Sequence, residues 1–250
     1  MTISEEQFEH FCRQASIPCT RLAEGEEKTA DYDILLGGQR IIVEVKEIKA
    51  NEADRQALCE LREKHSAGRG TNKVGSRIRN KIGAAKRQIE RLAAGKCPGV
   101  LLLYDTRSPE IRGVWPYEIL VAMYGYETID VHVSEDSNEP VRFGTHRFGK
   151  GKKLGPDCHT YISAIGILRE TVLANVLHID LYHNVYADHP LPLAEIVPRK
   201  DMTVFSVAPG GVNEFRGWAQ IVTKEEKEAN KASEATLEPA SGAVSSAPQG

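Results

Sequence analysis

Two carboxylates and a lysine, Asp31, Glu44 and Lys46, lie close together in the N-terminal part of the chain. Asp and Glu oxygens are preferred ligands of a hard divalent cation such as Mg²⁺, which polarises a phosphate and lowers the pKa of its water. A neighbouring lysine can position the attacking water or offset negative charge in the transition state. Together these residue types are suited to hydrolysis of a phosphodiester bond.

The segment that carries them is typical of a β-hairpin. Residues 30–48 read ADYDILLGGQRIIVEVKEI, two apolar runs joined by a Gly-Gly pair that suits a tight turn. Side chains alternate along a strand, so Glu44 and Lys46 share one face of the second strand, between two isoleucines. Asp31 and Asp33 share a face of the first strand. Carboxylates from both strands can therefore converge in a partly enclosed site.

The strand pair TADYDILLGGQRIIVEVK resembles the PD-(D/E)xK nuclease superfamily, with Asp31 thirteen residues before Glu44 and Lys46 two residues after it. The resemblance implies that Asp31 and Glu44 bind Mg²⁺, for which Mn²⁺ can substitute, with help from the backbone carbonyl of Val45, while Lys46 acts on the water. It also implies an α/β (α+β) fold with a restriction-endonuclease-like α-β-β-β-α-β core and a mixed sheet. The expected activity is hydrolysis of nucleic acid, with DNA favoured over RNA.

Two features depart from the family pattern or leave a choice open. Ala30 stands where the family has proline, and Asp33 is an alternative metal ligand to the first aspartate. Family members often carry an acidic residue on the first helix near the metal, for which Glu5 and Glu9 are candidates. We favour Glu5, because it lies on the same helix face as the first phenylalanine.

A strongly basic segment follows the hairpin. Residues 62–96 contain eleven basic and two acidic residues, a net charge of +9, whereas the whole chain carries -3. This density predicts contacts to the phosphates of nucleic acid. The alternatives are an ordinary exposed helix face, a nuclease-like module that binds without cleaving, and a structural protein with an acidic partner. The candidate nucleic-acid-binding residues are Arg69, Lys73, Arg77, Arg79, Lys81, Lys86 and Gln88.

Apolar spacing and turn residues predict the elements around this constellation. The first helix is expected to begin with a cap at Ser4 and to end before Pro18. Beyond the hairpin, the pattern predicts helices over 76–94 and 116–124, a helix giving way to a loop over 51–72, and strands around 19–23, 99–105, 129–133, 161–168 and 176–182.

Composition sets the wider expectations. We expect a nuclease-like core over 1–125, an α+β extension over 126–222 packed on that core, and a disordered tail over 223–250 that is rich in Ala, Ser, Glu and Pro. The five cysteines form no C-x-x-C pair, so they are expected to be reduced thiols. Without a signal peptide or a membrane span, a cytoplasmic protein is expected, and the sequence leaves a homodimer open.

Overall fold

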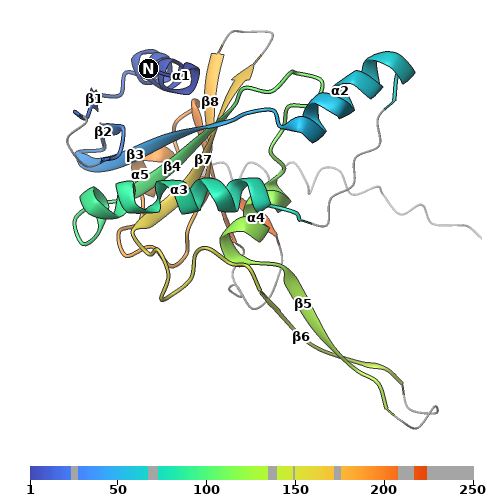
Figure 1. The fold of residues 1–250 in the computed structure, drawn as a ribbon. Helices are drawn as coiled ribbons and strands as arrows, with labels where there is room; N and C mark the ends of the chain where they lie inside the picture. The colour runs from blue at the N-terminus through green and yellow to red at the C-terminus, as the bar shows by residue number, and fades with distance from the viewer. Residues whose placement is uncertain are drawn as a thin grey trace, which may run out of the picture.

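A computed structural model describes residues 1–23, 28–66, 73–134, 140–148, 150–171, 176–207 and 217–223. Within these ranges the chain is mixed α/β, with five helices and ten strands. Eight strands form one large mixed sheet, and the other two form a separate ribbon (Figure 1). No helix in the described part is long and apolar enough to cross a membrane. Apart from its first residue, the tail expected over 223–250 lies outside the described residues.

The N-terminal elements follow the expected order, with a helix, three strands, further helices and a buried strand. They are α1 (Ile3–Gln14), β1 (Cys19–Arg21), β2 (Tyr32–Leu36), β3 (Gln39–Ile48), α2 (Glu52–Lys64), α3 (Ser76–Ala93) and β4 (Gly99–Asp105). The expected cap of α1 was wrong. Thr2 is the cap, because its hydroxyl accepts from the N–H of Glu5 while the Glu5 carboxylate accepts from the N–H of Thr2.

The C-terminal elements extend the same sheet. They are α4 (Pro116–Tyr124), β5 (Glu127–His132), β6 (Arg142–Phe148), β7 (Ile162–Thr171), β8 (Val176–His183), α5 (Leu193–Ile196), β9 (Met202–Val207) and β10 (Trp218–Ile221). The sheet order is β1-β2-β3-β4-β7-β8-β9-β10. The β3, β4 and β7 strands are mutually parallel, β8 and β9 are parallel to each other, and the remaining pairs are antiparallel. Strands on both sides of residue 125 therefore share one sheet.

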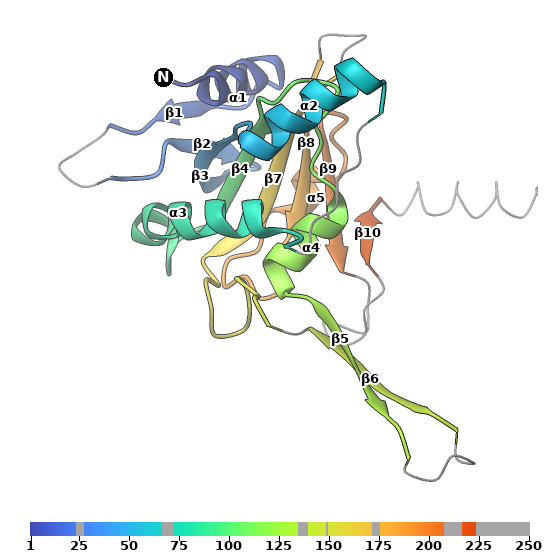
Figure 2. The same ribbon diagram turned by 45° about the vertical axis from the view of Figure 1, so that its right-hand side comes forward.

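Helices cover both faces of this sheet (Figure 2). The apolar stripe of α3 packs with α4 on one face, where it buries Ile78, Ile82, Ala85 and Ile89 as their spacing predicts. On the other face, α1 packs through Phe8 and neighbouring apolar side chains, together with α5. Each face thus has its own apolar core, and β4 is buried along its whole length between them.

The strand expected at 129–133 lies outside the main sheet. It is β5, which pairs with β6 in a two-stranded ribbon that projects from the body (Figure 2). Val131 pairs with Phe143, so these two share one face of the ribbon, and both are more than half exposed. The sequence pattern signalled the strand but not its position, because an exposed apolar strand and a buried one alternate in the same way.

A close approach of α3 to the sheet gives a test of this packing. A Cβ added at Gly99 would collide with the side chain of Ile89 and lie 2.6 Å from the backbone oxygen of Tyr161. We expect Gly99→Ala to lower the free energy of unfolding by about 2 kcal/mol, as overpacking does.

Gly83→Ala is the matched control. Gly83 lies within α3 with open space around it, so alanine there should raise the free energy by about 0.5–1 kcal/mol. Urea denaturation of both variants measures the difference, and equal effects would contradict this packing.

Candidate functional site

The register of the β2–β3 hairpin brings the two principal carboxylates together. Gly37 and Gly38 both have positive φ angles in the turn, as the sequence predicts. Tyr32 pairs with Val43, so the next residues outward, Asp31 and Glu44, lie opposite each other.

Asp31 is also tied directly to β3. Its Oδ2 accepts a hydrogen bond of 2.8 Å from the backbone N–H of Val45. The N–H and C=O of one strand residue point to the same side of the strand. The carbonyl of Val45 therefore points toward Asp31, as its N–H does.

Glu44 is enclosed between the sheet and α3. Its side chain has no exposed surface, and Ile42 and Ile48 belong to the core beneath the helix. One carboxylate oxygen contacts the ammonium of Lys46, whereas Oε2 is buried and no N–H or O–H donor of the described residues reaches it. A hydrogen bond shared with the Asp31 carboxyl favours the protonated form of Glu44. Burial raises the pKa of Glu44 to about 7; Lys46 opposes the shift and the charge of Asp31 adds to it. The site therefore holds a carboxylate whose negative charge is only partly compensated.

Asp31 has the same kind of environment. Burial is the main cause of its raised pKa, and the charge of Glu5 adds to the effect. The hydrogen bond from Val45 and the charge of Lys46 lower the pKa but do not outweigh burial. Two carboxylates are thus held close together where both lose hydration.

The acidic residues of α1 lie at different places. The Glu5 carboxylate accepts a hydrogen bond of 2.9 Å from Arg21 and caps its own helix, and its charge acts on Asp31. The Glu9 carboxylate instead accepts a hydrogen bond of 2.9 Å from the hydroxyl of Tyr32. Glu5 is therefore the α1 carboxylate whose charge acts on the first aspartate, and it is already engaged by a cation.

Asp33 lies away from the pair. It pairs with Ile42 in the hairpin register, nearer the turn, and its carboxylate accepts a hydrogen bond of 2.6 Å from Arg40. Asp31, and not Asp33, therefore lies opposite Glu44.

One flank of α3 faces the hairpin. Arg77, Lys81 and Gln88 lie on one side of the helix by their spacing, and we call them the site flank. The Gln88 amide donates a hydrogen bond of 3.1 Å to the backbone oxygen of Thr29, two residues before Asp31. Burial lowers the pKa of Lys81, and the positive charge of Lys46 lowers it further. The hairpin and α3 therefore enclose the site from two sides.

Two other candidate basic residues of α3 face away from the hairpin. Arg79 and Lys86 form the far flank of α3. The guanidinium of Arg79 donates to the backbone oxygen of Val121 in α4 and lies 5.3 Å above the ring of Tyr126. Lys86 lies near His159, whose pKa is lowered by burial and then by this lysine. Lys73 is exposed before the start of α3. Arg69 lies outside the described residues.

A buried ion-pair network beside the site was missed from the sequence. Asp54 accepts a bond of 2.6 Å from Arg77 and pairs with Arg107 at 3.5 Å, and Arg107 donates to Asp105 at 2.6 Å. Burial opposes ionisation of Asp105, but hydrogen bonds from Arg107 and Gly113 lower its pKa. Two features of the sequence could have indicated this network. Asp54 completes a capping box at the start of α2, and Asp105 is a carboxylate at the end of a buried strand.

The chemistry of the Asp31 and Glu44 pair fits a hard divalent cation. Oε2 of Glu44 lacks a positive partner, and the carboxylate of Asp31 and the backbone carbonyl of Val45 lie beside Glu44. In the described part of the chain, no three His, Cys, Asp or Glu side chains are grouped to hold a metal. Mg²⁺ commonly needs only one or two protein carboxylates, because substrate phosphates and water complete its octahedron.

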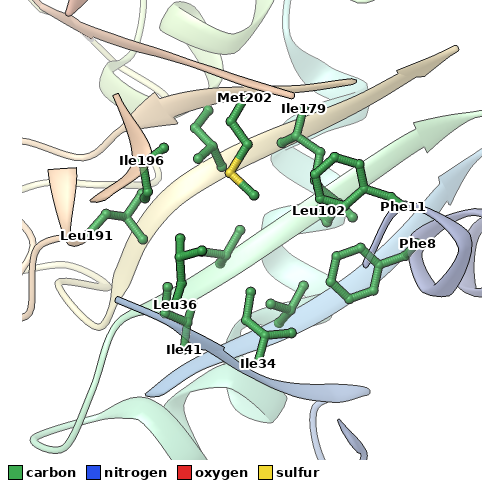
Figure 3. Close-up of a pocket in the computed structure, with 13 residues that line it drawn as sticks. Phe8, Phe11, Ile34, Leu36, Ile41, Leu102, Ile179, Leu191, Ile196 and Met202 are labelled. Atoms are coloured by element: carbon green, nitrogen blue, oxygen red, sulfur yellow. The ribbon is translucent and has the colours of Figure 1, made fainter. Parts of the chain in front are cut away.

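An apolar cavity on the other face of the sheet is chemically inert by comparison. It lies between α1, α5 and the strands, and residues such as Phe8, Leu102 and Met202 line it (Figure 3). All of its lining residues are apolar, and its volume is about 30 Å³. The hairpin face, with its converging charged groups, is the better place for chemistry.

Comparison with known proteins gives no match, whether with family models, curated proteins or solved structures.

The uncompensated charge of Glu44 predicts a stability effect. A carboxyl whose folded pKa lies above its ordinary value of 4.5 destabilises the fold as pH rises from there to about 7, and the cost is constant above that. In the metal-free protein we therefore expect Glu44→Gln to raise the free energy of unfolding by about 2–3 kcal/mol at pH 8 and to change it little at pH 4. Urea denaturation in EDTA across this range measures the difference.

Glu6→Gln serves as the control, because Glu6 is exposed on α1. It should leave the free energy within about 0.5 kcal/mol at every pH. A Glu44→Gln protein less stable than the wild type at pH 8 would show that the carboxylate is well compensated as it stands.

Proposed function

We propose that this protein is a metal-dependent nuclease of the PD-(D/E)xK kind, which hydrolyses phosphodiester bonds of nucleic acid, DNA in preference to RNA. The observation that carries the proposal is the fully buried Glu44, which lies opposite Asp31 with one carboxylate oxygen unpartnered. Burying a second carboxylate beside the first is costly without a cation. A buried carboxylate pair that destabilises the fold in this way is more typical of a functional site than of a structural one.

Each residue of the constellation has a role in this proposal. Asp31, Glu44 and the carbonyl of Val45 would hold Mg²⁺ or Mn²⁺, which supplies Lewis acidity toward a phosphate oxygen. Lys46 is in contact with Glu44, and its side chain is about one quarter exposed. Its ammonium can orient an attacking water or offset the charge that develops on phosphorus. Glu5 adds negative charge at the edge of the pair.

The element order gives further support. Residues 3–105 run helix, three strands, helices and a strand, which agrees with the restriction-endonuclease-like core that the motif implies. The strands of residues 162–221 extend this core on the far side of β4.

The charge distribution supports a polyanionic substrate. The segment 62–96, with its charge of +9, includes α3, and α3 packs over the strand that carries Glu44 and Lys46. A phosphate chain attracted to this helix would pass close to the carboxylates.

A cleavage assay tests the proposal. We expect the purified protein to cleave DNA in Mg²⁺ or Mn²⁺ and not in EDTA, with single-stranded, duplex and branched DNA and RNA compared as substrates. Asp31→Asn, Glu44→Gln and Lys46→Ala should each lose at least about 100-fold in rate. Asp33→Asn removes the same charge two residues from Asp31 but should stay within about threefold of the wild type, because Asp33 pairs with Arg40 outside the site.

Two results would contradict the nuclease proposal. Metal-independent cleavage that survives in Glu44→Gln would place the activity elsewhere or in a contaminant. Salt-dependent binding of nucleic acid without cleavage, equal in the wild type and in Glu44→Gln, would favour a nuclease-fold module that binds without catalysis.

A further inference from the structure

The basic side chains of α3 cannot all serve one ligand, because the site flank and the far flank face different parts of the molecule. We propose that Lys81 is the principal phosphate-binding residue of α3 and that the nucleic-acid backbone crosses the protein along the site flank. This inference rests on the proposed nuclease function and deepens it. It assigns the path of the substrate and the residue that holds it.

The position of Lys81 is fixed by hydrogen bonds on either side of it along the helix. Towards the C-terminus of α3, Gln88 bonds the backbone of Thr29 at 3.1 Å. Towards the N-terminus, Arg77 bonds Asp54, the third residue of α2, at 2.6 Å. Lys81 shares their flank by helical spacing and therefore lies between these two anchors, above the strand that carries Lys46.

The other cations around Lys81 already have partners. Positive charge from Lys46, Lys49 and Arg77 acts on it, while Glu47 is the carboxylate that offsets part of this charge. Three of the four cations are paired with a carboxylate in the structure, namely Lys46 with Glu44, Lys49 with Glu47 and Arg77 with Asp54. Lys81 makes no hydrogen bond or ion pair with any residue in the described ranges.

A half-buried ammonium among like charges is electrostatically unfavourable. Burial lowers the pKa of Lys81 first, and Lys46 and Lys49 lower it further. Binding of a phosphate would relieve both effects, because its charged oxygens replace the water contacts that burial removes and offset the charge of the neighbouring cations. Lys81 is thus the site-flank cation whose charge is left for an external anion.

The cations of the far flank lie away from the hairpin. Arg79 is committed to Val121 and to the hydroxyl of Tyr126, 3.3 Å away. Lys86 faces His159 rather than the hairpin. A phosphate on Lys81 would lie beside Lys46, so it belongs to a nucleotide neighbouring the bond that is cut.

Binding measurements in EDTA, where cleavage does not interfere, test this inference. The probes are a fluorescein-labelled DNA duplex and the corresponding single strand, titrated with protein over a range of salt concentrations. We expect Lys81→Gln to weaken binding about tenfold and to reduce the slope of log K against log salt by about one. Lys86→Gln removes the same charge from the other flank of the same helix and should change affinity less than about twofold.

Thermal unfolding separates binding from stability. Lys81→Gln should melt at the wild-type temperature or above it, since it removes a repelled charge; a lower melting temperature would assign Lys81 a structural role and overturn the inference. Unchanged binding by Lys81→Gln, or equal losses in both variants, would also overturn it while the proposed function stands. Failure of the wild-type protein to bind any nucleic acid would overturn both.

Discussion

The burial of Glu44 opposite Asp31 is the constraint on which the rest of the site depends. A carboxylate without exposed surface must find compensation inside the protein, and Lys46 supplies only part of it. The same chain buries Asp54 and Asp105, and there two arginines satisfy the charges. Burial outweighs compensation at Glu44, whose pKa rises, whereas arginine hydrogen bonds outweigh burial at Asp105, whose pKa falls. That contrast separates a carboxylate whose burial is only partly compensated from one whose charge the fold satisfies.

The sheet provides the rigidity that such a site needs. β3 lies next to β4, which is buried on both faces, and β7 continues the parallel pairing on the other side. The strands of the C-terminal half therefore support the hairpin through β4, although none of them carries a proposed metal ligand. The buried network of Asp54, Arg77 and Arg107 fixes α2 and α3 to the end of β4. The helix that closes the site is thus anchored by its packing and by charge pairs beyond it.

The sequence was sufficient for elements whose determinants are local. The Gly-Gly pair and strand alternation predicted the β2–β3 hairpin, and apolar spacing predicted α3 to within one residue at its C-terminal end. The cap of α1 was misplaced by two residues, because Thr2 and Ser4 are both good caps and only the bond with Glu5 decides between them. The strands β6, β9 and β10 were missed, since their apolar residues are few or are flanked by turn-forming residues. The place of β7 beside β4 depends on contacts distant in sequence, which periodicity does not encode.

The charge pattern of the sequence likewise does not determine how individual charges are placed around the site. The chain total of -3 conceals the +9 of residues 62–96, and that sum in turn conceals the division of α3 into two flanks. A helix turns by 100° per residue, so a continuous basic run always points its charges in several directions. Which direction faces a ligand depends on the packing of the helix, here on the anchors at Thr29, Asp54 and Val121. Net charge therefore describes the segment as a whole, whereas the pairing of each individual cation depends on the direction in which the packed helix points it.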